Sequence, residues 1–354
     1  MAIDTSNLRR EAERIIKIVK NDLMMPSGSL CWERTGNSMM NHEIFSDLGD
    51  YMIFLLYFGE AEFVESQIAL LKKRLKKYVL VSSFPTKHIK NLVKSYEYTD
   101  LLFGLIDYWQ AEPGNFARRR LLDCVANNGL RIFKQFKVPK SFYSYDLFFA
   151  WPVFDTRDGT FLEIYSDLYN LTLDRAYLDA ALRIFETLVC SSFYKKYNLF
   201  PDYQFYYGLD NLLTILGYKG RATICKNNTN TLFGLLSLYK TTKDEQIKVV
   251  INNVLGEIER RVRPSNGLVP QYIYPTGEIG GAKAFLTASF SLIDFLCDWH
   301  VEIGETKHLD LAKLVADFWS DFQSQQTGLF PTFSGGESTF LDSETDMFVA
   351  LYKL

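Results

Sequence analysis

The sequence predicts an all-α protein, a toroid of helical hairpins, and three observations lead to this fold class. First, apolar residues recur with a helical period along most of the chain, with almost no strand-like alternation. Second, several neighbouring helices are joined by the same kind of short turn. Third, one loop pattern (turn residue, Leu, apolar residue, Pro, polar residue, aromatic residue) occurs three times, in "YNLFPDYQ" (197–204), "NGLVPQYI" (266–273) and "TGLFPTFS" (327–334).

The helical period predicts twelve helices in chain order. Their expected spans are 5–22, 42–58, 61–78, 92–110, 113–136, 159–173, 175–192, 228–241, 243–262, 280–302, 306–324 and 342–354. The turns between paired helices each contain an acid: Glu60, Asp174, Asp244 or Glu305. A turn this short forces the two helices to pack antiparallel, and an acid suits the positive end of the second helix dipole. Each pair is therefore a helical hairpin.

The two helices of a hairpin differ in character. The first is apolar nearly all round, as in "YMIFLLYF" (51–58) and "TLFGLLSLY" (231–239), whereas the second has one charged face. The first type is expected on the inside and the second on the outside. The first helix of the chain resembles the outer set and the twelfth resembles the inner set, so that helix 1 can pack beside helix 12 and close a ring. The sequence thus predicts a single domain over 1–354 with six inner and six outer helices.

This pattern resembles the (α/α)6-barrel, or six-hairpin, superfamily of carbohydrate-active enzymes, and the resemblance covers the whole chain. The superfamily includes glycoside hydrolases, polysaccharide lyases and sugar epimerases. The resemblance therefore implies a glycan-processing enzyme without selecting among these reactions.

Composition narrows the choice of partners. A formal charge of −3 and a pI near 5.9 leave no basic surplus for nucleic acid. No apolar run approaches the length of a membrane span, and the N-terminus lacks the pattern of a signal peptide. The five cysteines are scattered, without the spacing of metal ligands, which predicts reduced thiols, a cytoplasmic location and no metal or cofactor.

The long connections between hairpins are expected to converge on one end of the toroid and to form its mouth. Asp50, Asp100 and Asp346 each precede an apolar inner stretch and are the predicted catalytic carboxylates, although Asp is also a common helix cap. Other acids expected at the mouth are Glu43, Asp47, Asp155, Asp158, Glu163, Asp202, Glu278, Glu337, Asp342 and Glu344.

Two aromatic segments are the predicted substrate-binding loops. "WPVFDTRDG" (151–159) combines an aromatic platform with acids and an arginine that could clamp a carboxylate. "QYIYPTGEIGG" (271–281) has alternating tyrosines and glycines that allow close backbone approach. The predicted substrate-binding residues are Trp151, Asp155, Arg157, Tyr272, Tyr274, Glu278 and His42.

Three functions fit these residues. The leading hypothesis is hydrolysis of an oligosaccharide by a pair of carboxylates. The second is lyase or epimerase chemistry on a uronic acid, in which Arg157 neutralises the substrate carboxylate and Tyr272, Tyr274 or His42 transfers a proton. The third is a non-catalytic toroid that binds a glycan or a protein.

Overall fold

The computed structural model describes part of the chain: residues 10, 12–14, 16–17, 20–21, 34–35, 38–39, 49, 52, 54–77, 95–136, 153–155, 159–201, 203–205, 223–262, 264, 266–274, 279–322, 330–336, 347, 349–351 and 353–354. The chain divides into two compact units. Unit 1 comprises Met1–Gln135 and Phe340–Phe348, and unit 2 comprises Phe136–Thr339 and Val349–Leu354. A single domain over 1–354 stays a prediction. Within the described ranges, no helix has the length and apolar character needed to cross a membrane.

In the described part of unit 1, the helices with defined bounds are α3 (Ala61–Lys77), α4 (Ser95–Gln110) and α5 (Phe116–Phe136), and further helical residues lie at 10–21 and 49–57 wherever those ranges are described. Two short strands, β1 (Arg34–Thr35) and β2 (Ser38–Met39), pair antiparallel. The expected helices 61–78, 92–110 and 113–136 are confirmed to within three residues. Gly104 of α4 faces Gly49 so closely that an added Cβ atom would lie 2.8 Å from the Gly49 backbone.

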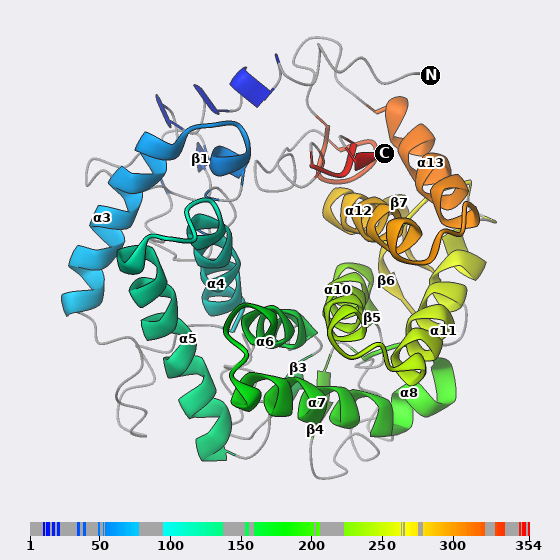
Figure 1. Cartoon of the computed structure of the whole chain (residues 1–354). Helices are drawn as coiled ribbons and strands as arrows, with labels where there is room; N and C mark the ends of the chain where they lie inside the picture. The colour runs from blue at the N-terminus through cyan, green and yellow to red at the C-terminus, as the bar shows by residue number, and fades with distance from the viewer. Residues whose placement is uncertain are drawn as a thin grey trace. The chain divides into compact units, whose positions relative to one another are not determined.

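Unit 2 contains two rows of helices (Figure 1). One row is α6 (Gly159–Thr172), α10 (Cys225–Thr242) and α12 (Leu286–Ile303). The other is α7 (Arg175–Cys190), α11 (Glu245–Val262) and α13 (Lys307–Ser320), with the short helix α8 (Ser192–Tyr197) after α7. The members of the first row are buried on most sides and those of the second carry an exposed charged face, as the sequence predicts for inner and outer helices.

The turns of two hairpins in unit 2 have the same geometry. In "TLD" (172–174) and "TKD" (242–244), the threonine hydroxyl accepts a hydrogen bond from the aspartate N–H, at 3.1 and 3.3 Å. The aspartate carboxylate then accepts one from the backbone N–H two residues later, at 2.9 Å in both turns. The middle residues, Leu173 and Lys243, have left-handed φ values of 58° and 55°. The expectation that an acid caps the second helix is thus confirmed for Asp174 and Asp244.

Short strands lie in the connections that precede the inner helices of unit 2. β3 (Val153–Asp155) pairs antiparallel with β4 (Tyr203–Phe205), and β5 (Thr223–Ile224), β6 (Pro270–Ile273) and β7 (Ile279–Ala284) form a second small antiparallel sheet. The helix expected over 280–302 therefore begins only at Leu286. The segment before it, "IGGAKA", is a strand because its two adjacent glycines disfavour a helix and it completes the ladder on β6.

The inner helices α6, α10 and α12 run parallel. Gly159 lies against Thr231 near the start of both helices, and Asn170 donates to the Thr241 hydroxyl at 2.9 Å near their ends. Between α10 and α12, the Phe233 and Phe295 rings meet edge to face at 5.3 Å. The N-terminal ends of these helices therefore lie at one end of unit 2, together with the strands that lead into them.

The repeated Leu-apolar-Pro loop is anchored at this same end. Leu199, Phe200 and Pro201 are buried, and the Asn228 side chain of α10 hydrogen-bonds to both the backbone N–H and the backbone carbonyl of Phe200. The Asn228 Oδ1 atom accepts from the Phe200 N–H at 2.9 Å, and its Nδ2 atom donates to the Phe200 carbonyl at 3.0 Å. In the second copy, the Val269 carbonyl accepts from the Phe285 N–H at 2.9 Å.

The third copy is anchored in a similar way. Phe330 and Pro331 are buried, and the Thr332 carbonyl accepts from the Leu286 N–H at 2.9 Å, where α12 begins. In all three copies, the apolar residue and the proline are buried next to the start of an inner helix. Each copy thus buries its apolar residue and its proline at the same place relative to an inner helix, which accounts for the recurrence of the loop pattern.

Replacing Asn228 by Ala is expected to lower the free energy of unfolding by roughly 2–4 kcal/mol, because the buried Phe200 N–H and carbonyl would both lose their partner. Urea unfolding followed by circular dichroism measures this loss. Asn230→Ala, two residues along the same helix at a half-buried position, is the control and is expected to change stability far less. Equal losses in the two variants would show that Asn228 does not anchor the loop.

Candidate functional site

A group of ionisable side chains lies among the inner helices of unit 2. Glu163 and Asp167 come from successive turns of α6, and Asp294 and Asp298 come from successive turns of α12. Lys353 joins them from the helical residues at 349–351 and 353. The charges of the other four side chains all act on Glu163, and Lys353 forms ion pairs with Asp294 and Asp298; we refer to the five residues as the acid cluster.

Glu163 is the carboxyl that this environment perturbs most. Burial raises its pKa well above the ordinary value, and the charges of Asp167, Asp294 and Asp298 raise it further, while Lys353 opposes them. Within the described ranges, no group donates a hydrogen bond that would stabilise the ionised form. Burial of the carboxyl and the neighbouring acids therefore favour its protonated form, although part of the Glu163 residue as a whole remains exposed.

Asp167 has a different environment one turn further along α6. Burial raises its pKa to about 6, but a hydrogen bond from the Ser237 hydroxyl and the charge of Lys240 favour the ionised form. Both partners come from α10. In the pair Glu163 and Asp167, burial and neighbouring acids thus favour the protonated form of the first carboxyl, whereas Ser237 and Lys240 favour the ionised form of the second.

Asp294 and Asp298 are paired with Lys353. The Lys353 Nζ atom lies 2.6 Å from Asp294 Oδ1 and 3.0 and 3.1 Å from the two carboxylate oxygens of Asp298. The three side chains are 22–36% exposed, so the ion pairs are partly shielded from contact with solvent. Burial lowers the pKa of Lys353, but the two carboxylates more than offset this and the net pKa is raised.

The close packing of α6 on α10 fixes the position of Glu163. A Cβ atom added at Gly234 would lie 2.3 Å from the Gly159 carbonyl oxygen and 3.1 Å from the Glu163 backbone nitrogen. A Cβ atom at Gly159 would lie 2.3 Å from the Thr231 hydroxyl oxygen. The two helices therefore meet backbone to backbone beside Glu163, which only glycine permits.

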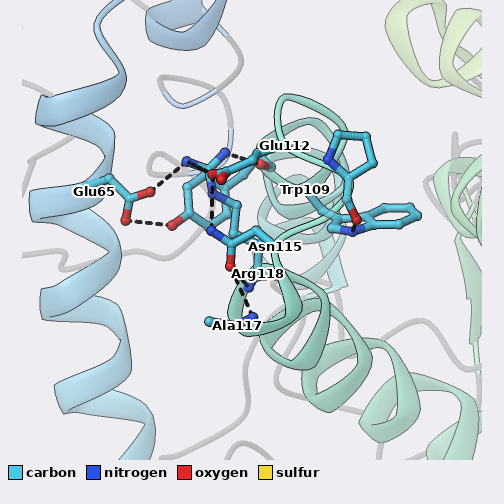
Figure 2. Close-up of polar contacts among 8 residues, drawn as sticks. Glu65, Trp109, Glu112, Asn115, Ala117 and Arg118 are labelled. Carbon is cyan, nitrogen blue, oxygen red and sulfur yellow. Dashed lines mark hydrogen bonds and ion pairs between the residues drawn. The ribbon is translucent and has the colours of Figure 1, made fainter.

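A second polar cluster, in unit 1, has a structural role (Figure 2). The Arg118 guanidinium donates to Glu65 Oε1 at 2.7 Å and to the Tyr108 carbonyl at 2.8 Å, and the Tyr108 hydroxyl donates to Glu65 Oε2 at 2.6 Å. Asn115 caps the start of α5 by accepting from the Ala117 and Arg118 N–H groups. The cluster ties α3, α4 and α5 together where α4 ends.

The pKa shifts in this cluster agree with that role. Burial opposes ionisation of Glu65, but hydrogen bonds from Tyr108 and Arg118 lower its pKa. Burial and the Glu65 charge raise the pKa of Tyr108. Glu65 therefore stays ionised and Tyr108 stays neutral over the physiological range, so neither group is set up to exchange a proton.

Most of the predicted site residues fall outside the described part of the chain. These are Asp50, Asp346, Trp151, Arg157, Glu278 and His42. Asp100 lies in the first turns of α4, although only its backbone is described. Asp155 is the last residue of β3, opposite Tyr203 of β4. Tyr272 lies in β6, and Tyr274, which follows it, is half-buried. The roles of these residues stay predictions.

Sequence reasoning placed Glu163 among many mouth acids and did not single out Asp167, Asp294, Asp298 or Lys353. A signal for the acids was present in the sequence. Both "EIYSD" (163–167) and "DFLCD" (294–298) place two acids four residues apart on helices that are otherwise largely apolar. Residues four apart share one helix face, so each helix carries a short acidic stripe.

Two of the histidines, His300 and His308, lie in the described part of the chain. His300 lies in the last turn of α12 and His308 in the first turn of α13, and both contact Glu305 in the short turn between the two helices. Among the described residues, no three His, Cys, Asp or Glu side chains are grouped as metal ligands.

Comparison with known proteins identifies the fold. No protein-family model and no curated protein sequence matches the chain. Among solved structures, a D-mannose isomerase is similar over 100% of this chain and 98% of its own, with a TM-score of 0.72 and 10% identity. An unsaturated glucuronyl hydrolase specific for heparin is similar over 99% of this chain and 97% of its own, with a TM-score of 0.70 and 13% identity. The GH76 α-mannanase of Bacteroides thetaiotaomicron is similar over 98% of this chain and 96% of its own, with a TM-score of 0.67 and 18% identity.

Proposed function

We propose, from the (α/α)6-toroid fold that this chain shares with these sugar-active enzymes, that it is a glycan-processing enzyme that hydrolyses an oligosaccharide. The observation that carries the proposal is the pair formed by Glu163 and Asp167. Burial and neighbouring acids favour the protonated form of Glu163, while the Ser237 hydrogen bond and the Lys240 charge favour the ionised form of Asp167. Two carboxyl groups whose pKa values are pushed apart are the requirement for glycosidic hydrolysis.

In this mechanism, Glu163 is the general acid. It donates its proton to the glycosidic oxygen as the bond to the leaving sugar breaks, and the developing positive charge on the ring is favoured by the surrounding carboxylates. Asp167 is the second carboxylate, which activates water or attacks the sugar carbon directly. Side chains four residues apart on a helix have Cβ atoms about 5–6 Å apart, which places both carboxyl groups within reach of one glycosidic bond.

Substrate binding is assigned to the loops before the inner helices. Tyr272 and Tyr274 adjoin the start of α10 through the β5–β6 pairing, and Asp155 lies in the strand before α6. We propose that these residues, with Trp151, Arg157, Glu278 and His42, contact the sugar, and that Asp50, Asp100 and Asp346 remain candidates for supporting carboxylates. A cytoplasmic location is part of the same proposal and is consistent with the free thiols of Cys190, Cys225 and Cys297.

Incubation with a panel of oligosaccharides in heavy water tests the proposed reaction. The panel should contain α-mannosides, β-glucosides and unsaturated and saturated uronosides, and the products should be read by mass spectrometry and near-ultraviolet absorbance. Hydrolysis gives fragments that have gained one solvent molecule. New absorbance without added solvent would replace hydrolysis by elimination. A glycan that binds without any turnover would contradict an enzymatic role and favour a binding toroid.

Isomerisation or epimerisation of a sugar is the second candidate, and the similarity to a D-mannose isomerase favours it. In that reaction, a protonated carboxyl such as Glu163 would exchange a proton with the sugar, and Asp167 would accept one from carbon. Deuterium uptake into an intact sugar, in the same experiment, distinguishes this candidate from hydrolysis.

A further inference from the structure

We propose that Ser237 is a positioning residue for Asp167: its hydroxyl holds the Asp167 carboxylate in place across the interface between α6 and α10. The inference rests on the proposed function, in which Asp167 is the second carboxylate. It assigns a role to a side chain of α10 that does not touch the sugar in that scheme.

A hydrogen bond joins the two side chains directly. The Ser237 hydroxyl donates to Asp167 Oδ1. Ser237 is buried and Asp167 is half-buried, so the bond lies between the two helices rather than on an exposed surface. Because Oδ1 is engaged with Ser237, the second oxygen, Oδ2, is the one left to act on water or on the sugar carbon.

The two helices are held in a fixed register around this hydrogen bond. One turn further along, the Asn170 side chain donates to the Thr241 hydroxyl at 2.9 Å, and that hydroxyl donates to the Ser237 carbonyl at 2.8 Å. Toward the start of both helices, α6 and α10 meet backbone to backbone at Gly159 and Gly234. The Ser237 hydroxyl therefore has a fixed position relative to α6, as a residue that orients a catalytic group requires.

The same hydrogen bond affects the charge of Asp167. Burial raises the pKa of Asp167 to about 6, and the Ser237 hydroxyl and the Lys240 ammonium group, both on α10, oppose this rise. On α6 itself, Glu163 lies one turn earlier, and its protonated form, which burial favours, brings no negative charge. On α7, Tyr177 packs against α6 and is uncharged at neutral pH.

Ser237→Ala tests the proposal, because alanine removes the hydroxyl and keeps a small side chain at this buried position. The Asp167 pKa is expected to rise by roughly one unit, since a hydrogen bond to the ionised carboxylate is lost. Carbon-13 NMR of the intact protein labelled at the aspartate carboxyl carbon measures this shift, and the signal is assigned by its loss in Asp167→Asn. Ser237→Thr, which keeps a hydroxyl, is expected to titrate like the unsubstituted protein.

Thr241→Val is the matched control. It removes the neighbouring hydrogen bond with Asn170 between the same two helices and keeps the shape of the side chain, without removing a partner of Asp167. A merely structural role for Ser237 predicts that both variants lose stability in urea unfolding and titrate alike at Asp167. A pKa shift in Ser237→Ala but not in Thr241→Val is expected, and an equal titration of Asp167 in the two folded variants would overturn the proposal.

Activity provides the second readout. On a glycan that the protein hydrolyses, Ser237→Ala is expected to lower kcat roughly 10–100-fold with little change in KM, and to move the acidic limb of the pH–rate profile to higher pH. An unchanged kcat and an unmoved acidic limb would overturn the positioning role. If the Asp167 titration shifts as expected but no glycan is hydrolysed, the contact between Ser237 and Asp167 stands and the proposed function is wrong.

Discussion

Replacing Glu163 by Gln is expected to lower the turnover number by roughly 10²–10⁴-fold, because the amide has nearly the same shape but cannot donate an acidic proton to the leaving oxygen. Substrate affinity should change much less, since the amide can still hydrogen-bond to the sugar. Steady-state kinetics on the glycan identified by the panel measures both quantities. The expected loss therefore appears in kcat rather than in KM.

Glu186→Gln is the matched control, because Glu186 is an exposed residue on the outer helix α7 and should leave turnover unchanged. Full activity in Glu163→Gln would remove Glu163 as the acid and return attention to Asp100, Asp50 and Asp346.

A second readout needs no substrate. The folded-state pKa of Glu163 is raised above its unfolded value, so Glu163 contributes stability that is fully present below the ordinary carboxyl pKa and is lost as pH rises through the raised pKa. The unfolding free energy of Glu163→Gln should therefore fall less over that window. Chemical unfolding of the variant and of the unsubstituted protein at several pH values measures the difference.

Gly234→Ala is expected to lower the free energy of unfolding by roughly 3 kcal/mol. The added methyl group would lie 2.3 Å from the Gly159 carbonyl oxygen, and neither helix backbone can move without disturbing its neighbours. Separation of α6 from α10 would also displace Glu163, so activity should fall together with stability. Urea unfolding at constant pH gives the magnitude.

Gly256→Ala is the matched control for this prediction. Gly256 also lies within a helix, α11, but a Cβ atom added there meets nothing within 4 Å. Alanine should therefore stabilise the protein at this position by about 0.5–1 kcal/mol, since it favours the helix over the unfolded chain. A stabilising Gly234→Ala would mean that the two inner helices are less closely packed than described.

The sequence predicted the long helices well because their periodicity extends over several turns. The expected spans 61–78 and 159–173 differ from α3 and α6 by one residue at one end. It missed the short strands, such as β7, because a strand of six residues with two glycines carries no periodic signal, and its identity depends on pairing with β6. Helix α8 was missed for a similar reason, since six residues barely exceed one turn.

The candidate site was harder to predict than the fold. Glu163 was recognised as one of many acids, but its distinguishing property is a pKa that depends on burial and on Asp294 and Asp298, about 130 residues away in the chain. A single sequence does not give that juxtaposition. Asp100, by contrast, stood out in the sequence because it precedes an apolar stretch, but α4 begins five residues earlier, at Ser95, so a helix cap does not explain an acid at this position.

The anchored loops also affect the thermodynamics of ligand binding. Phe200 and Val269 are buried and fixed by hydrogen bonds, and the strands β4 and β6 follow them almost directly. The conformational entropy of these segments is lost when the protein folds, so it does not have to be lost again on binding, where ordering costs about 0.5–1.5 kcal/mol for each flexible side chain. A ligand that contacts β4 or β6 therefore loses mainly its own internal freedom, which favours short, stiff saccharides over long, flexible ones.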